Sequence, residues 1–319
     1  MSTVGQIEKK TQQRVAKLFQ HALGYEHLGD WAERPNNANI EPELLRGWLE
    51  EQGVEANLAS RAIFELNKAT NDASMGLYDR NKAVYELLRY GVKIKPEVGE
   101  NTQTVWLINW KQADKNHFAI AEEVTVKGVD AKANTKRPDI VLYVNGIALG
   151  VLELKRSKVA VNEGIRQNLD NQKVEFIQPF FSTQQFVMAG NDTQGLRYGT
   201  IQTGEKYYLT WKEESEESTT ADNLLDRHLL QLCNKTRFLE LIHDYIVFDS
   251  GVKKLCRHNQ YFGIREAQRY LRQREGGIIW HTQGSGKSLT MVWLTKWIRE
   301  NIQDSRVLII TDRTELDEQ

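Results

Sequence analysis

The chain has 319 residues, enough for two domains, and 40% of them are hydrophobic, which allows well-packed cores. A formal net charge of −1 excludes a uniformly basic nucleic-acid-binding protein but leaves room for a local basic cleft. Two distant cysteines, the lack of an N-terminal apolar signal core and the lack of any run of about 20 apolar residues favour a cytoplasmic protein without a membrane span.

Amphipathic helices are predicted for much of the first ninety residues. Apolar residues recur at helical spacing between Gln6 and Leu23, and a second helix begins at Pro42 and closes at Gly53. Further helices are predicted at 56–66 and 78–90. β-Branched and aromatic runs then predict strands at 104–109 and 118–126.

A hairpin follows, with strands Ile140–Val144 and Ile147–Leu154 joined by Asn145-Gly146. This dipeptide suits a type I′ turn, in which both central residues have positive φ. Asp139 opens the first strand, and Glu153 and Lys155 share one face of the second because side chains alternate along a strand. The antiparallel register is therefore expected to bring Asp139 close to Glu153.

Two carboxylates and an ammonium in an apolar hairpin are unfavourable unless they are paired or bind a metal. One interpretation is that Asp139 and Glu153 hold Mg²⁺, which polarises a phosphate and acidifies a bound water. Lys155 would then orient or deprotonate that water, or stabilise the developing charge. The alternative is an ordinary Glu-Lys pair on the solvent face of an edge strand.

The order Pro138-Asp139, then Glu153-Leu154-Lys155, resembles the PD-(D/E)xK nuclease motif. The resemblance implies an α/β fold with a restriction-endonuclease-like mixed sheet and flanking helices. It implies that Asp139, Glu153 and Lys155 are catalytic and that the two carboxylates bind the metal. Such nucleases often carry an acidic residue on the preceding helix, for which Glu86 is the candidate; a solvated helix position is the alternative. A subset carries Gln-x-x-x-Tyr on the following helix, and here Gln167 is present without the Tyr.

The elements around the hairpin are predicted from the same signals. The loop Lys132–Arg137 is basic and would either grip DNA phosphates or be solvated. A helix is predicted at 163–173, and runs at 176–181, 185–190 and 196–203 are expected to complete the sheet. The acidic loop Glu213–Thr220 is expected at the edge of this unit, before a helical connector, Leu224–Tyr245.

A second chemical site is predicted near the end of the chain. A helix from Tyr261 precedes a short buried strand, Gly276–Trp280; the loop His281-Thr-Gln-Gly-Ser-Gly-Lys-Ser288 follows, and then a helix, Leu289–Arg299. Strand, glycine-rich loop and helix form the context of a P-loop, whose N–H groups and helix N-terminus cradle phosphate oxygens. The strict pattern opens with Gly, whereas His281 stands here.

Each polar residue of this loop has an expected role. Lys287 would reach the β- and γ-phosphates of ATP, and Ser288 would ligate its Mg²⁺. Gln268 resembles the adenine-reading Gln of superfamily 2 helicases, and a ring of Tyr261 or Phe262 would either stack nearby or pack in the core. The predicted nucleotide-binding residues are Gln268, Gln283, Gly284, Ser285, Gly286, Lys287 and Ser288. A further strand is predicted at 307–311, in keeping with a parallel RecA-like sheet.

The two sites in this order, with the segments Pro179-Phe-Phe-Ser-Thr-Gln and Asp312-Arg-Thr-Glu-Leu-Asp-Glu-Gln, resemble the motor (R) subunit of type I restriction-modification enzymes. The resemblance implies that residues 1–250 form the endonuclease and that 251–319 begin the first RecA-like lobe. It implies an ATP-driven double-stranded DNA translocase that works with methyltransferase and specificity subunits, which would hold S-adenosylmethionine.

Two alternatives to this assignment stay open. One is another ATP-coupled helicase-nuclease, such as a type III subunit, in which the nuclease follows the motor instead of preceding it. The other is a nuclease fold without catalytic activity that docks a motor onto its partners. Because no Walker B motif or second motor lobe is recognised, the chain is expected to be the front of a longer protein and unable to hydrolyse ATP productively by itself.

Overall fold

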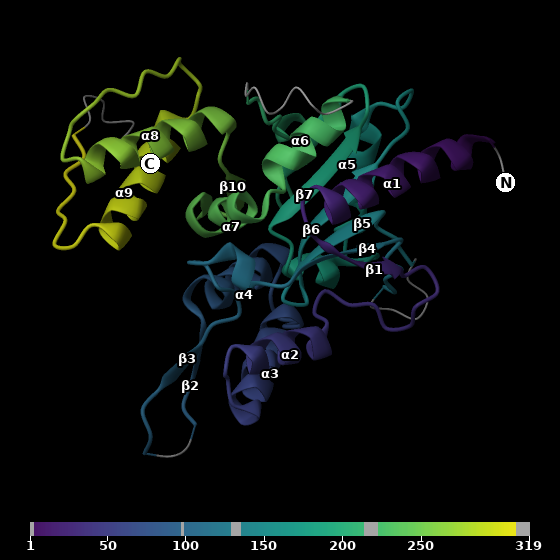
Figure 1. Cartoon of the computed structure of the whole chain (residues 1–319), viewed down its shortest axis with the longest axis horizontal. Helices are drawn as coiled ribbons and strands as arrows, with labels where there is room; N and C mark the ends of the chain where they lie inside the picture. The colour runs from purple at the N-terminus through teal and green to yellow at the C-terminus, as the bar shows by residue number, and fades with distance from the viewer. Residues whose placement is uncertain (1–2, 97–98, 129–134, 214–222, 311–319) are drawn as a thin grey trace.

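The computed structural model describes residues 3–96, 99–128, 135–213 and 223–310. A mixed sheet with helices on both sides forms the main body, and the last two helices, α8 and α9, form a separate lobe beside it (Figure 1). The protein is therefore α/β, as the sequence predicts. None of the helices in the described ranges is long and apolar enough to cross a membrane.

Six strands form the central sheet, in the order β1-β4-β5-β6-β7-β8. The pairs β1–β4 and β6–β7 are parallel, and the other three neighbouring pairs are antiparallel. The strands are β1 Glu26–Asp30, β4 Phe118–Glu122, β5 Ile140–Val144, β6 Ile147–Leu154, β7 Phe186–Asn191 and β8 Gly195–Gly199.

The predicted hairpin, β5 and β6, lies in the middle of this sheet. Asn145 and Gly146 have φ values of 52° and 78°, as a type I′ turn requires. A Cβ on Gly146 would come within 2.8 Å of the carbonyl oxygen of Glu41, so the close approach of α2 also requires glycine there. Every residue of the two strands is buried, because both faces of the sheet carry an apolar layer. The hairpin is thus not an edge with a solvent face.

Alternate residues of β5 belong to different cores. Ile140, Leu142 and Val144 pack in the larger cluster, while Val141 and Tyr143 pack in a second one on the opposite face. This alternation is the period-2 pattern of a strand buried on both sides. The helices that flank the sheet are α1 Thr3–His21, α2 Pro42–Glu51, α3 Ala56–Thr70, α4 Leu77–Tyr90, α5 Val161–Asn171, α6 Leu224–Leu232 and α7 Lys235–Asp244.

Two small hairpins complete the described chain before the C-terminal lobe. The strands β2 Val92–Ile94 and β3 Gln103–Val105 project from the body (Figure 1). The strands β9 Ile246–Asp249 and β10 Val252–Leu255 are joined by Ser250-Gly251, both at positive φ. The sequence analysis missed β1, β2, β9 and β10. Of the strand predicted at 104–109, only residues 104 and 105 are in a strand, as the end of β3.

One strand prediction in the middle of the chain was wrong. Residues 176–181 form no strand but lead into a 3-10 helix, η2 Gln178–Ser182, because Pro179 has no N–H for a sheet hydrogen bond. The predicted helical connector 224–245 is confirmed; it consists of two helices, since the Asn234 side chain accepts a hydrogen bond from Arg237 N and starts α7. The acidic loop at 213–220 lies outside the described residues except for Glu213, which pairs with Arg237.

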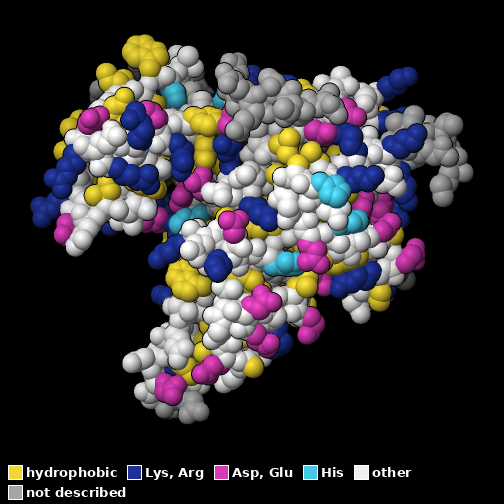
Figure 2. Space-filling view, viewed as in Figure 1, with side chains coloured by type: hydrophobic (Ala, Val, Ile, Leu, Met, Phe, Trp, Pro, Cys, Tyr) yellow, Lys and Arg dark blue, Asp and Glu magenta, His cyan; other side chains and the backbone are white. Residues whose placement is uncertain are grey.

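The C-terminal lobe contains α8 His258–Arg272 and α9 Lys287–Asn301. The predicted buried strand at 276–280 was wrong: no strand forms there, and Ile278 and Trp280 are each 89% exposed. Residues 307–310 of the second predicted strand are likewise unpaired, and residue 311 lies outside the described ranges. A single extended segment cannot form the hydrogen bonds of a sheet without a neighbouring strand. Figure 2 shows apolar side chains exposed over this lobe.

Candidate active site and nucleotide-binding loop

The hairpin places the predicted catalytic residues together. Ile140 pairs with Leu152, so the antiparallel register sets Asp139 opposite Glu153. The backbone N–H of Leu154 donates to Asp139 Oδ2 at 2.6 Å, which fixes this carboxylate against β6. Lys155 Nζ lies 3.9 Å from Glu153 Oε2. The three groups thus share one face at the end of the hairpin.

Helix α5 lies directly over this face. Gly164 lets it approach the sheet closely, because a Cβ there would come within 3.1 Å of Ala189 Cβ on β7. One turn further on, Gln167 Oε1 accepts a hydrogen bond of 2.7 Å from Lys155 Nζ. The helix therefore orients the lysine, which is 14% exposed at its side chain, toward the carboxylates.

Burial disfavours the ionised form of both carboxyl groups when no cation is bound. Desolvation raises the pKa of Asp139 to about 6, against the opposing effect of the Leu154 hydrogen bond. Burial, and then the charge of Asp139, raise the pKa of Glu153 well above its usual range. The charge of one carboxylate thus opposes ionisation of the other.

The donor set fits a hard divalent cation. Glu153 is fully buried, and neither of its oxygens has a hydrogen-bond donor in the described part of the chain. Unpartnered buried oxygens beside a second carboxylate are the ligands that Mg²⁺ prefers. The described residues contain no group of three or more His, Cys, Asp or Glu side chains that could hold a metal. Waters or substrate oxygens would have to complete the coordination.

An open cleft of about 580 Å³ leads to Asp139 and Lys155. Lys9, Lys136 and Arg137 line it together with Asp30 and Glu123, so its lining carries charges of both signs. Of the predicted basic loop, residues 132–134 lie outside the described ranges, whereas 135–137 are cleft residues. The cleft thus combines the carboxylates with positive charge suited to phosphate.

Two cleft residues were missed by the sequence analysis. Gln12 of α1 donates to the backbone oxygen of Asp139 at 3.3 Å. Glu123, at φ 52°, donates its backbone N–H to the same oxygen at 2.9 Å and pairs with Arg137 at 2.7 Å. No local pattern marks either residue, because each meets Asp139 only through the fold. Glu86 is exposed on α4 and does not line this cleft. Its position agrees with the alternative interpretation, that of a solvated residue on the helix surface.

The glycine-rich loop ends at Gly286, which has φ 84° and is the N-cap of α9. Lys287 Nζ donates to the carbonyl oxygen of Thr282 at 3.1 Å, so the lysine folds back over the loop. The other predicted loop residues, Gln283, Gly284, Ser285 and Ser288, lie between His281 and the first turn of α9. Ser285 Oγ donates to the carbonyl of Thr282 at 2.7 Å, which holds the loop in a compact turn.

Gln268 lines a cavity to which no residue of 281–288 contributes. Instead, Gln260 Nε2 donates to the Gly286 carbonyl at 2.8 Å, and Arg257 Nη1 donates to the Gly284 carbonyl at 2.9 Å. Tyr261 packs in the core and donates its hydroxyl to Glu240. Nothing local distinguishes Gln260 from Gln268, since both lie on α8 and both are buried.

The burial of the two carboxylates leads to a stability prediction. A carboxyl group with a higher pKa in the folded than in the unfolded protein lowers the free energy of unfolding at any pH where the unfolded chain is ionised. For Asp139 this loss of stability grows as the pH rises from about 4 through 6. Glu153→Gln removes one buried ionisable group. We expect the free energy of unfolding to increase by about 2 kcal/mol and Tm to rise by about 5 °C at pH 8 in EDTA. Thermal unfolding should show a smaller gain at pH 5, and none for the exposed control Glu163→Gln. Destabilisation at pH 8 would contradict the account.

Comparison with known proteins places two family models on the chain. The model of the type I restriction enzyme R protein N terminus matches residues 5–206, and the SWI2/SNF2 ATPase model matches residues 259–319. The first therefore covers the sheet and the cleft, and the second covers α8, the glycine-rich loop and α9.

Three curated relatives carry matching names. The HindI endonuclease subunit of a type I restriction enzyme from Haemophilus influenzae is 26% identical over 98% of this chain and 32% of its own length. The putative MjaIXP and MjaVIIIP subunits of Methanocaldococcus jannaschii are each 27% identical, over 75% and 88% of the chain and 26% and 30% of their own lengths. The chain spans about a third or less of each of these relatives.

Proposed function

The chain belongs to the family of type I restriction enzyme R protein N termini, and from this membership we propose that its cleft cuts double-stranded DNA with the help of Mg²⁺. Homologues named as endonuclease subunits of type I restriction enzymes support a nuclease of a restriction system. The finer assignment rests on one observation: Glu153 is fully buried with two unpartnered oxygens beside Asp139.

The metal, when bound by Asp139 and Glu153, supplies phosphate polarisation and a more acidic water. Charge stabilisation, positioning and attraction of the DNA are assigned to residues of the chain. Lys155, oriented by Gln167, stabilises negative charge that develops on the attacked phosphate or holds the attacking water. Gln12 and the Glu123 backbone keep the start of β5 in place through the Asp139 carbonyl. Lys9, Lys136 and Arg137 attract the DNA backbone into the cleft.

We propose a motor role for the C-terminal part, with residues 1–250 as the nuclease and 251–319 as the beginning of the first RecA-like lobe. The SWI2/SNF2 match supports this division. Lys287 would leave the Thr282 carbonyl for the phosphates of ATP, and Ser288 would bind its Mg²⁺. Arg257 and Gln260 would keep the loop in shape through its carbonyls. Methyltransferase and specificity subunits are the proposed partners.

Metal removal tests the nuclease proposal. In the intact protein with its partners, nicking of plasmid DNA should be lost in EDTA and return on addition of Mg²⁺. Ca²⁺, a larger and more flexibly coordinated ion, should restore DNA binding but not cutting. Cleavage that continues at full rate in EDTA would rule out the proposed metal role.

A further inference from the structure

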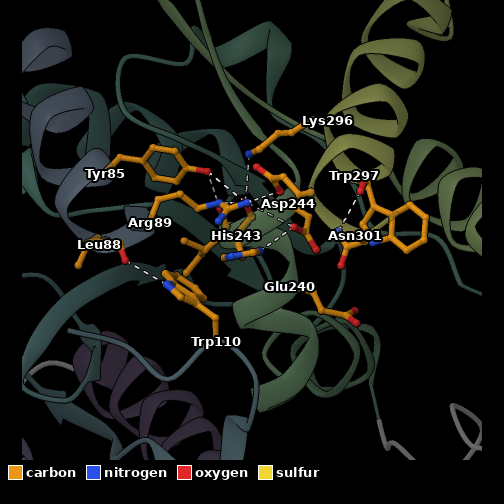
Figure 3. Close-up of polar contacts among 12 residues, drawn as sticks. Tyr85, Leu88, Arg89, Trp110, Glu240, His243, Asp244, Lys296, Trp297 and Asn301 are labelled. Carbon is orange, nitrogen blue, oxygen red and sulfur yellow. Dashed lines mark hydrogen bonds and ion pairs between the residues drawn. The ribbon is translucent and has the colours of Figure 1, made fainter. Parts of the chain in front are cut away.

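The carboxyl end of α7 joins the main body to the C-terminal lobe, because side chains of α4 and α9 meet there (Figure 3). The carbonyl oxygen of His243, in the last turn of α7, accepts a hydrogen bond of 2.9 Å from Arg89 Nε of α4. The same oxygen accepts one of 3.3 Å from Lys296 Nζ of α9. Since the carboxyl end of a helix carries partial negative charge, it attracts a cation from both sides.

Arg89 also reaches the lobe directly. Its Nη2 lies 2.5 Å from Glu300 Oε2 on α9 and 4.0 Å from Asp244 Oδ1 at the end of α7. Burial, and then the charge of Arg89, lower the pKa of Lys296, whereas the two carboxylates raise it. The forked guanidinium thus holds α7 through Nε and α9 through Nη2, which a single ammonium cannot do.

The two ends of the Arg89–Glu300 ion pair differ in burial. The Arg89 side chain is 7% exposed, and Tyr85, one turn earlier on α4, donates its hydroxyl to the Ile242 carbonyl of α7 at 3.0 Å. The Glu300 side chain is 32% exposed, in the last turn of α9. Loss of this ion pair would therefore leave α4 bound to α7 and would loosen the end of α9.

A separate contact anchors the segment that leads into the lobe. Lys253 of β10 is buried, and its ammonium donates to Asn81 Oδ1 of α4 at 2.8 Å and to Gln185 Oε1 at 2.6 Å. Both acceptors belong to the main body, since Gln185 immediately precedes β7. Because β10 leads directly into α8, the lobe stays attached at this point when the contact at Glu300 is broken.

The helix α9 connects this ion pair with the glycine-rich loop. It begins at Lys287, and Glu300 lies about 20 Å further on, at the helical rise of about 1.5 Å per residue. The Lys287 ammonium donates to the Thr282 carbonyl, and it must leave this oxygen to contact a phosphate. Because a packed helix shifts as a unit, a rearrangement of its first turn also moves Glu300 relative to Arg89.

We propose that the Arg89–Glu300 ion pair is an autoinhibitory latch: when closed, it holds α9 where the glycine-rich loop binds nucleotide weakly, and nucleotide binding opens it. The proposal rests on the nucleotide site proposed at Lys287 and adds a regulatory contact with the nuclease body. Linkage is reciprocal, so a change that opens the latch must raise the affinity for nucleotide, just as nucleotide favours the open form.

The nucleotide affinity of the intact protein tests the latch. Glu300→Gln removes the ion pair, and we expect the Kd of a fluorescent ATP analogue with Mg²⁺ to fall roughly fivefold. A side chain with a merely structural role would not produce this gain, because its loss would loosen the lobe and weaken binding. Asp304→Asn changes an exposed carboxylate shortly after α9; it is the matched control and should leave the Kd unchanged.

A second variant assigns the effect to the ion pair. Arg89→Met should give a similar gain, and Glu300→Gln should add nothing further in that background. If Arg89→Met does not fold, Glu300→Gln decides alone, since its side chain is partly exposed. Binding by the original protein with an equal or higher Kd for Glu300→Gln would overturn the latch, and so would a full gain from Glu300→Gln in the absence of Arg89. Binding by neither protein at millimolar concentration would instead overturn the nucleotide site, and the latch with it.

Discussion

Replacing Lys155 with alanine is expected to reduce DNA cleavage by at least about 10²–10³-fold while DNA-stimulated ATP hydrolysis by the complete enzyme stays within about twofold of the original. Lys155 Nζ lies near the buried carboxylate of Glu153 and is held by Gln167, so its loss removes positive charge from the site where charge develops. Cleavage of plasmid DNA and phosphate release, measured on the same preparation, give the two rates.

A matched control separates this effect from a general loss of positive charge. Lys173 lies outside the cleft and pairs with Asp170 at the surface, so Lys173→Ala should cut DNA normally. If Lys155→Ala lost cleavage and ATP hydrolysis together, the two sites would not be separate and the assignment of Lys155 would be wrong.

Lys287→Ala is expected to have the opposite profile, with ATP hydrolysis and translocation reduced by roughly 10²-fold or more and Mn²⁺ binding at Asp139 and Glu153 unchanged. In the structure the Lys287 ammonium donates to the carbonyl oxygens of His281 and Thr282 in the glycine-rich loop, which is the proposed phosphate site. Its removal takes away the cation for the β- and γ-phosphates.

The control for this variant lies on the same helix. Arg299→Ala changes an exposed cation near the far end of α9 and should leave hydrolysis near its original rate. Binding of a fluorescent ATP analogue and steady-state phosphate release provide the measurements. If both variants lost ATP hydrolysis equally, the effect would follow from any change of charge on this helix, and the proposed role of Lys287 would be wrong.

The sequence predicted the parts of the site that depend on local chemistry. Asn145-Gly146 specifies a two-residue turn that pairs Val144 with Ile147. A β-bulge between Leu142 and Tyr143 then shifts the register by one residue and sets Asp139 opposite Glu153, and no sequence signal marked this bulge. In contrast, Gln12 comes from α1, more than a hundred residues before Asp139, and reaches it only because the helix packs beside the sheet. Contacts of this kind have no periodicity or turn signal.

The errors have similar physical causes. The apolar run at 276–280 has strand composition, but strand structure also requires a paired neighbour, which the described residues do not provide. The adenine-reading role of Gln268 stays a prediction. Only the packing of α8 decides that Gln260, and not another residue of this helix, reaches the Gly286 carbonyl. Pro179 and Asn234, on the other hand, were signals in the sequence that a stricter use of backbone chemistry would have interpreted correctly.

The remaining alternative is a nuclease fold that only docks a motor onto its partners. Such a module has no need for two buried carboxylates of raised pKa side by side at this cleft, because replacing one of them with an amide would stabilise it. The presence of the pair favours a bound cation.

The most direct test is a crystal of the protein soaked in Mn²⁺, with anomalous scattering used to locate the ion. The account predicts one strong peak within about 2.3 Å of carboxylate oxygens from both Asp139 and Glu153, and its absence in Glu153→Gln. Full Mn²⁺ occupancy elsewhere with no peak between these two side chains would contradict the proposed active site.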